Sequence, residues 1–350
     1  MTRLMIILIV SISPVLDSCL ELHSGENKSL EFPITFEQAD SAILAGEFGT
    51  IHSLLIQQNG VLIFEKYYNH WNPDSLHPLQ SATKTVVAAL LGCAIQQRFI
   101  GSENDLIGDY LPEGYCLDSM KRHIRIKDLL TQQHGLRWNE GAWEDTANSW
   151  RKIINTKGNW YKAVLATAMD TLPGTKFVYS NAAPLLVAGI IQWSSKMRIE
   201  DFAKRFLFGP LGIEQNRFWQ GNGGPSENGM AMLSLSSRDM IKIGQLFLQE
   251  GVWNDQQLIP KQFSVDAISA KVSNVGRNGV YQRYDYGYFW WINPVLYGKN
   301  EGLPVFMARG AGGQNIIVWP ERKWVLVITA WNRQQPNKPQ SILDKYPVGD

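Results

Sequence analysis

The amino-acid sequence predicts an α/β (α+β) fold in which one antiparallel sheet is built from both ends of the chain and flanked by helices. Segments rich in β-branched and aromatic residues lie near the start, at 51–68, and near the end, at 286–332. Residues 81–250 between them have mainly helical patterns. No repeat or linker divides the chain, so we expect the strands to share one sheet, with a helical region inserted in the middle.

Composition limits the possible functions. The chain has 350 residues, of which 45% are hydrophobic, enough for a sizeable core, and we expect a single domain over residues 36–345. The formal net charge of +1 argues against nucleic acid as a partner. The 13 tryptophans and 12 tyrosines serve either core packing or a pocket with flat apolar walls. The second of these alternatives would suit a small-molecule partner.

The first 19 residues resemble an export signal. Arg3 precedes an apolar run, residues 4–15, that is too short to span a membrane. The following Leu-Asp-Ser-Cys19 resembles the sequence at which bacterial lipoproteins are cut and acylated on cysteine. We expect a signal peptide over residues 1–19 and a polar tether over 20–35. Lipidation of Cys19 and ordinary signal cleavage are the alternatives; both place the protein in the bacterial periplasm or cell envelope, with membrane contact only through a lipid anchor.

Cysteines and histidines predict neither a disulfide framework nor a metal site. After the signal only Cys93, in an apolar helical segment, and Cys116, in a loop, remain. The six histidines are scattered, and there is no Cys-x-x-Cys or His-Glu-x-x-His motif. We expect no metal ion and no cofactor.

Individual strands and helices follow from local patterns. Asn59-Gly60 joins two apolar runs as a predicted hairpin, and Pro320 begins the turn between the last two strands. The final helix of the middle region should begin after Ser236 or Ser237 and end at Gly251. The segments predicted as late strands are 286–292, 315–320 and 324–332, and those predicted as helices are 86–97, 126–132, 183–195, 199–207 and 236–251.

Ser81-Ala82-Thr83-Lys84 is the first candidate for chemistry. It opens a helix that is apolar on every face, so Ser81 lies where free N–H groups and the helix dipole favour negative charge. Lys84 lies on the same helix face as Ser81. Burial disfavours the charged form of a lysine, so a neutral amine becomes available as a base. The alternative is a capping serine beside a lysine that snorkels to solvent. A second copy of the spacing, Ser149 to Lys152, lies in a polar stretch and is interpreted as surface.

Two further motifs accompany this pair. Tyr179-Ser180-Asn181 stands directly before another apolar helix, whereas the equally spaced Tyr67-Tyr68-Asn69 ends a strand and is interpreted as chance. Residues 307–313, Met-Ala-Arg-Gly-Ala-Gly-Gly, lead into a late strand, and their glycines let a ligand approach the backbone. This stretch is not a dinucleotide loop, because Asn315 replaces the last glycine and a strand follows.

In this order the three motifs resemble the serine β-lactamase and penicillin-binding-protein superfamily. The class C β-lactamase, family VIII esterase and 6-aminohexanoate-dimer hydrolase branches are the most similar, over roughly residues 50–332. The resemblance implies a β-lactamase-like fold and a serine hydrolase that cleaves a carboxylic ester or amide through an acyl-enzyme. A β-lactamase or D-Ala-D-Ala carboxypeptidase is the alternative enzyme, and a non-catalytic ligand-binding lipoprotein is the alternative of another class.

The resemblance also implies residue roles. Ser81 is the nucleophile, Lys84 its base and Tyr179 the second proton-transfer group. The backbone N–H groups of Ser81 and Ala311 form the oxyanion hole. Asn181 orients Lys84 and the substrate, and the supporting glycines of the strand are Gly310 and Gly312.

One departure from the family pattern concerns substrate choice. Lysine or histidine usually opens the glycine-rich strand, and Ala308 stands there instead. Arg309 is adjacent, but alternation along a strand predicts that it points to the other face. We therefore expect neutral esters to be better substrates than β-lactams. His134 offers a Ser–His pair as an alternative, without the Gly-x-Ser-x-Gly elbow that such hydrolases use.

Overall fold

The computed structural model describes residues 34–115, 117–219, 232–275, 284–293, 304–335 and 339–342. All of them belong to the unit Pro33–Asp350. The predicted signal peptide with Cys19, the tether up to residue 33, and Cys116 lie outside the described residues, so these expectations and the domain boundaries remain predictions. Among the described residues, no helix is long and apolar enough to cross a bilayer.

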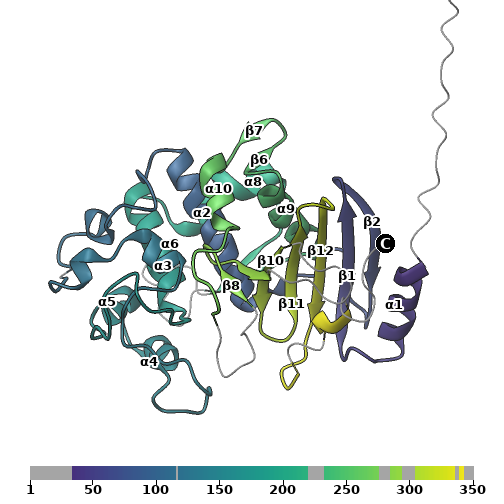
Figure 1. Cartoon of the computed structure of the whole chain (residues 1–350), viewed down its shortest axis with the longest axis horizontal. Coiled ribbons are helices and arrows are strands. Elements are labelled where there is room, and N and C mark those ends of the chain that lie inside the picture. The colour runs from purple at the N-terminus through teal and green to yellow at the C-terminus, as the bar shows by residue number, and fades with distance from the viewer. Residues whose placement is uncertain are drawn as a thin grey trace, which may run out of the picture. The chain divides into compact units, whose positions relative to one another are not determined.

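A seven-stranded antiparallel sheet joins the two ends of the described chain, as predicted (Figure 1). The first and last strands in the order of the chain are direct neighbours in this sheet, with Leu55 opposite Val327. In sheet order the strands are β2 (Val61–Tyr67), β1 (Ile51–Gln58), β12 (Trp324–Ala330), β11 (Gln314–Trp319), β10 (Val305–Gly310), β9 (Trp291–Asn293) and β8 (Asp285–Tyr286). The predicted fold class is confirmed.

The predicted turns occur, and one predicted strand does not. Asn59 and Gly60 have φ of 50° and 81°, the left-handed pair that a tight hairpin requires. Lys323 N–H donates to the Pro320 carbonyl at 3.0 Å, closing the last turn. The expected strand over 286–292 is instead a hairpin between β8 and β9, because Gly287 N–H donates back to the Trp290 carbonyl at 2.9 Å. This turn is buried and apolar, so its sequence resembles that of a strand.

Helices cover both faces of the sheet. On α1 (Ile34–Leu44), Phe36 packs against Phe64 and Trp324, with ring centroids 5.5 and 6.1 Å apart. On the opposite face, Gly244 of α9 (Ser237–Leu248) lies so close to the sheet that an added Cβ would be 2.6 Å from Val325 Cγ1. Ser236 caps α9, as predicted, and accepts from the Asp239 N–H at 3.1 Å. The helix ends at Leu248 rather than at Gly251.

The helical region between β2 and β9 packs around α2 (Thr83–Gln96), in which every residue from 83 to 94 is buried. The neighbours of α2 include α6 (Ala182–Ser195), α10 (Lys261–Ala267) and β10. The other helices are α3 (Ile126–Leu130), α4 (Ser149–Asn155), α5 (Trp160–Leu165), α7 (Ile199–Ala203) and α8 (Gly209–Leu211), with a π turn, η4 (Lys204–Phe208), inside the segment predicted as one helix.

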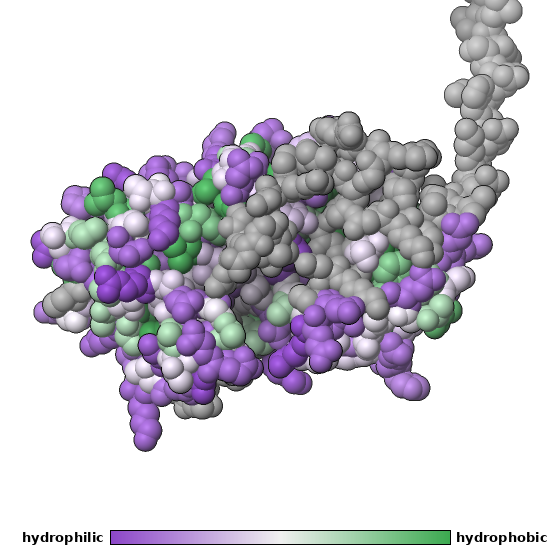
Figure 2. Space-filling view, turned by 60° about the horizontal axis from the view of Figure 1, so that its bottom comes forward, coloured by the Kyte–Doolittle hydropathy of each residue, from purple (hydrophilic) through white to green (hydrophobic). Residues whose placement is uncertain are grey.

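Short elements connect this region to the sheet. A small sheet has the order β3 (His77–Pro78), β5 (Met232–Leu235), β4 (Arg217–Trp219), and β6 (Val252–Trp253) pairs with β7 (Gln256–Gln257). The 3₁₀ turns are η1 (Gln80–Ala82), η2 (Ile107–Tyr110), η3 (Lys121–His123) and η6 (Pro339–Ser341). On the face shown in Figure 2, hydrophobic residues form small areas among hydrophilic ones.

Candidate active site

Ser81 lies in η1, the turn between β3 and α2, and is half-buried. The turn is tied to β5 on both sides of the serine. Leu79 N–H donates to the Leu233 carbonyl at 2.8 Å, and Thr83 Oγ1 accepts from Leu233 N–H at 3.1 Å. Gln80 has φ of 52°, an uncommon conformation for a residue with a side chain. The surrounding bonds therefore fix a sharp, strained entry into α2 next to the candidate nucleophile.

Lys84 is buried in the first turn of α2, with only 3% of its surface exposed. Its Nζ donates to Ser81 Oγ at 3.2 Å and to Asn181 Oδ1 at 2.5 Å. It also lies 4.6 Å from the centre of the Tyr179 ring. This amine does not snorkel to solvent; a hydroxyl, an amide and an aromatic face surround it. The helical spacing of three residues brings the serine and lysine side chains together.

The Tyr179-Ser180-Asn181 segment is held by the side chain of Gln132. Its Oε1 accepts from Ser180 N–H at 3.0 Å and from Ser180 Oγ at 2.9 Å, while its Nε2 donates to the Ser180 carbonyl at 3.1 Å. Gln132 therefore binds the middle residue of the segment as a neighbouring strand would. The flanking side chains, Tyr179 and Asn181, are then both directed at Lys84.

His134 supports the same segment and does not form a pair with Ser81. Its Nδ1 accepts from Leu136 N–H at 3.1 Å, so Nε2 carries the proton and donates to Ser180 Oγ at 3.0 Å. Burial lowers the pKa of His134 from 6.5 to about 4 and keeps the ring neutral. The alternative of a Ser–His pair is wrong.

Glu140 completes the cluster, and its position was not foreseen from the sequence. Its carboxylate accepts from the Asn181 backbone N–H at 2.5 Å, from Asn181 Nδ2 at 2.7 Å and from Trp138 Nε1 at 2.6 Å. The signal available was an acidic residue following the Gln-Gln-His-Gly-Leu stretch, 132–136. Acidic loop residues are common, so this position was not distinguishable before the fold was known.

The glycine-rich end of β10 packs directly against the turn that carries Ser81. A Cβ added to Gly310 would be 2.1 Å from the Leu79 carbonyl oxygen, so only glycine permits this approach. Gly312 has φ of 85° and lies beneath Trp331, while Ala311 between them is exposed. The segments that carry Ser81 and Ala311 are thus neighbours, and the oxyanion hole formed by their N–H groups remains a prediction.

Comparison with known proteins agrees with this geometry. Residues 52–346 match the family model described as Beta-lactamase. The chain belongs to the beta-lactamase family. It is 20% identical over 304 residues to the 6-aminohexanoate-dimer hydrolase of Paenarthrobacter ureafaciens, covering 80% of this chain and 72% of that protein.

Solved structures of this family share the fold. The D-stereospecific amidohydrolase from a Streptomyces species superposes with a TM-score of 0.67 at 15% identity, covering 90% of this chain and 98% of the other. The octameric penicillin-binding protein homologue from Pyrococcus abyssi gives 0.68 at 17% identity, covering 88% and 75%. The chain is a serine hydrolase of the beta-lactamase family.

The family strand motif departs from expectation at two neighbouring positions. Ala308 is buried, with 1% of its surface exposed. The Arg309 guanidinium lies 5.1 Å from the ring centre of Tyr284 and 6.0 Å from that of Trp291. The Trp291 ring in turn packs 5.5 Å from Tyr179. Ala308 and Arg309 alternate along the strand, as expected, and the arginine lies against an aromatic wall formed by Tyr284 and Trp291.

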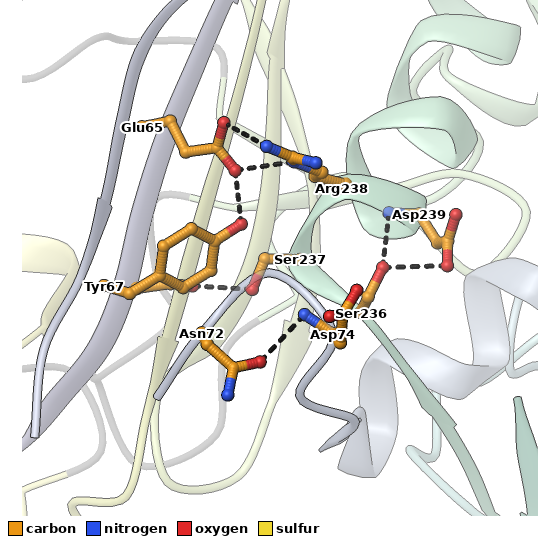
Figure 3. A network of polar contacts seen from close by, with 9 residues as sticks. Glu65, Tyr67, Asn72, Asp74, Ser236, Ser237, Arg238 and Asp239 are labelled. Atoms are coloured by element: carbon orange, nitrogen blue, oxygen red, sulfur yellow. Dashed lines mark hydrogen bonds and ion pairs between the residues drawn. The ribbon is translucent and has the colours of Figure 1, made fainter. Parts of the chain in front are cut away.

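The second copies of both short motifs have other roles in this beta-lactamase-family chain. Tyr67 donates to Glu65 at 2.5 Å, and Glu65 pairs with Arg238 at 2.7 Å, which ties β2 to the start of α9 (Figure 3). Ser149 Oγ accepts from Asn139 N–H at 3.0 Å, and Lys152 is exposed. Among the residues that the structure describes, neither copy contacts a buried amine, in agreement with the interpretation made from sequence.

Proposed function

We propose that the protein hydrolyses a carboxylic ester or amide through an acyl-enzyme on Ser81. One observation carries this proposal: Lys84 Nζ, removed from solvent, lies 3.2 Å from Ser81 Oγ. A buried lysine has few uses for stability alone, since desolvating a charge costs free energy. A lysine amine at hydrogen-bonding distance from a serine hydroxyl is placed to take the hydroxyl proton as a general base.

The reaction follows from the neighbours of this pair. Lys84 Nζ takes the hydroxyl proton as Ser81 Oγ bonds to the carbonyl carbon. The N–H groups of Ser81 and Ala311 stabilise the oxyanion, a contribution of about 3 kcal/mol per donor. Tyr179 passes a proton to the leaving alcohol or amine as the carbon–heteroatom bond breaks. Water then attacks the acyl-enzyme, giving up a proton through the same groups, and Ser81 Oγ leaves with its proton restored.

A second candidate activity acts on substrates that carry a carboxylate, such as β-lactams or D-Ala-terminated peptides. Arg309 on the aromatic wall favours it, because a guanidinium binds carboxylates through several N–H donors. Similarity to hydrolases of amide dimers supports small amides as a third kind of substrate within the same mechanism.

One experiment tests the mechanism and ranks these substrates. The purified protein is labelled with a fluorophosphonate probe and its mass measured, while p-nitrophenyl butyrate, nitrocefin and 6-aminohexanoate dimer are assayed in parallel. Labelling of wild type but not of Ser81→Ala, together with turnover of at least one substrate, is expected. Absence of label on Ser81 would contradict the acyl-enzyme.

We also propose that the chain is exported and acylated on Cys19, on the basis of the apolar run and the lipobox-like sequence. Expressed in a bacterium, the protein should fractionate with membranes, and Cys19→Ala should be released or left unprocessed. Mass spectrometry of the mature N-terminus decides between the alternatives. An unmodified start beyond Cys19 would reject lipidation and retain export, while a retained Met1 would reject both.

A further inference from the structure

Glu140 contacts Asn181 through both of its carboxylate oxygens. Oε1 accepts from the Asn181 backbone N–H at 2.5 Å, and Oε2 accepts from Asn181 Nδ2 at 2.7 Å. Trp138 Nε1 donates to Oε1 at 2.6 Å and so holds the carboxylate in place. Asn181 then accepts from Lys84 Nζ with the other end of its side-chain amide, at 2.5 Å. A continuous chain of hydrogen bonds therefore leads from Trp138 to Ser81.

The chemistry of these groups leaves one arrangement for Asn181. An ionised carboxylate has no donor, so it can face only the NH₂ end of an amide. The amide oxygen must then face Lys84, whose amine requires an acceptor when protonated. We propose that Glu140 is a positioning residue that fixes the amide orientation of Asn181 and thereby the position of Lys84 Nζ beside Ser81. This inference rests on the proposed function of Ser81 and Lys84.

The start of α6 shows that the Asn181 side chain bonds to Glu140 and Lys84 instead of capping the helix. Asparagine at an N-cap position ordinarily accepts from a backbone N–H of the first turn. Within the part of the chain that the structure describes, Asn181 makes no such bond, and the Ser180 hydroxyl accepts from Ala183 N–H at 3.3 Å instead. The neighbouring serine thus caps the helix, while the asparagine side chain lies between Glu140 and Lys84.

Glu140→Gln tests the orientation with little change of shape. Glutamine keeps one acceptor oxygen, but its NH₂ group meets the Asn181 NH₂ group, and two donors cannot bond. Turning the Asn181 amide over relieves this conflict and presents a donor to Lys84. We expect kcat to fall by roughly tenfold to a hundredfold, as for other outer partners of a reactive group, with KM nearly unchanged because Glu140 does not touch substrate.

Two variants and one double-mutant cycle distinguish a positioning role of Glu140 from a role in folding. Glu140→Asp retains two acceptors and should recover part of the lost kcat, whereas Glu144→Gln, an exposed residue of the same loop, should leave kcat and Tm unchanged. In an Asn181→Ala background, Glu140→Gln should cost little more, because the two residues act as a unit.

The rate at which the fluorophosphonate labels Ser81 distinguishes the two proposals. If wild type is not labelled, the proposed function fails. If wild type is labelled and Glu140→Gln is labelled at the same rate, the positioning role is overturned. Equal losses in Glu140→Gln and Glu140→Asp, accompanied by a raised KM and a lowered Tm, would overturn it too and leave Glu140 a structural residue.

Discussion

The chain contains two Ser-x-x-Lys segments at the starts of helices, and they differ in what surrounds the lysine. In α2, Lys84 is 3% exposed and contacts Ser81 and Asn181. In α4, Lys152 is exposed, and Ser149 binds the backbone of Asn139. Both pairs have the same helical spacing, so spacing alone cannot create a base.

What distinguishes the α2 pair is a second segment that approaches from elsewhere in the chain. Tyr179 and Asn181 stand at the start of α6, and Gln132 and Glu140 hold that segment in place. Gln132 makes three hydrogen bonds to Ser180, and Glu140 makes two to Asn181. These five bonds hold the segment that contacts Lys84 beside Ser81. The α4 pair has helix geometry without such a partner segment among the described residues.

Removing either member of the α2 pair should have the largest effect. Ser81→Ala and Lys84→Ala should each lower kcat/KM by at least about a thousandfold, because one loses the nucleophile and the other its base. The double variant should cost little more, since the two act as a unit. The measurement is steady-state hydrolysis of p-nitrophenyl butyrate.

The matched controls are Ser149→Ala and Lys152→Ala, which should each keep activity within about twofold, a change of under about 0.5 kcal/mol. Near-normal hydrolysis by Lys84→Ala, or comparable losses in the α4 controls, would remove the distinction between the two regions.

Tyr179 and Tyr67, which begin the two Tyr-x-Asn segments, allow a second comparison of the same kind. Tyr179→Phe keeps the ring that packs against Lys84 and Trp291 but loses the hydroxyl, so kcat should fall roughly 10²–10⁴-fold with the fold intact. Tyr67→Phe loses a bond to Glu65 and should lower the free energy of unfolding by about 1 kcal/mol without changing kcat. Urea unfolding and kinetics on the same preparations measure both. Identical kinetic losses in the two variants would make Tyr179 no more than a packing residue.

These contrasts also mark what could be predicted from sequence. Ser81, Lys84 and Tyr179 stand out because each lies at or just before the start of an unusually apolar helix, and an apolar segment can be recognised from its own residues alone. The hairpin at Asn59-Gly60 was predictable for the same reason, since a left-handed turn has few suitable residues.

Glu140 and Arg309 could not be assigned from sequence, because their roles depend on contacts between segments far apart in the chain. Glu140 matters only through Asn181, 41 positions later. The contacts of Arg309 with Tyr284 and Trp291 could not be predicted, because they join β10 to a region that was expected to be a single strand. The buried turn after Gly287 was missed because its residues are as apolar as those of a strand.

His134 offers a prediction about pH rather than rate. Its pKa in the folded chain is about 4, below the ordinary 6.5 that the unfolded chain retains. The unfolded state therefore binds a proton first as pH falls, so stability is complete above 6.5 and declines towards pH 4. This one group should lower the free energy of unfolding by about 3 kcal/mol at pH 4 relative to pH 7.

His134→Gln removes the titrating group and should make urea unfolding less sensitive to pH over that window than wild type. His123→Gln, at an exposed position, serves as the control and should match wild type at every pH. A His134→Gln curve parallel to that of wild type would show that the ring is protonated in neither state or in both.

The smallest predicted effect concerns the two neighbours on β10. Ala308 is buried, whereas Arg309 lies against Tyr284 and Trp291. Arginine has five N–H donors, so it can keep its contacts in the free protein and still bind a substrate carboxylate. A charge-assisted bond of about 1.5–3 kcal/mol corresponds to a factor of roughly ten to a hundred.

Arg309→Ala should therefore lower kcat/KM for nitrocefin by that factor and leave p-nitrophenyl butyrate, which has no carboxylate, within about twofold. Arg322→Ala removes a guanidinium from the Trp319 ring at the far end of β11 and should leave kcat/KM unchanged for both substrates.

Ala308→Lys is the opposing test, since a lysine there can help an anionic substrate only if its side chain reaches the site from a buried position. If Arg309→Ala lowers kcat/KM equally for both substrates, the arginine holds the aromatic wall in place and does not bind the substrate carboxylate. If Ala308→Lys raises the rate of nitrocefin hydrolysis and Arg309→Ala leaves it unchanged, the side chain at 308 determines the preference between anionic and neutral substrates, as the sequence indicated.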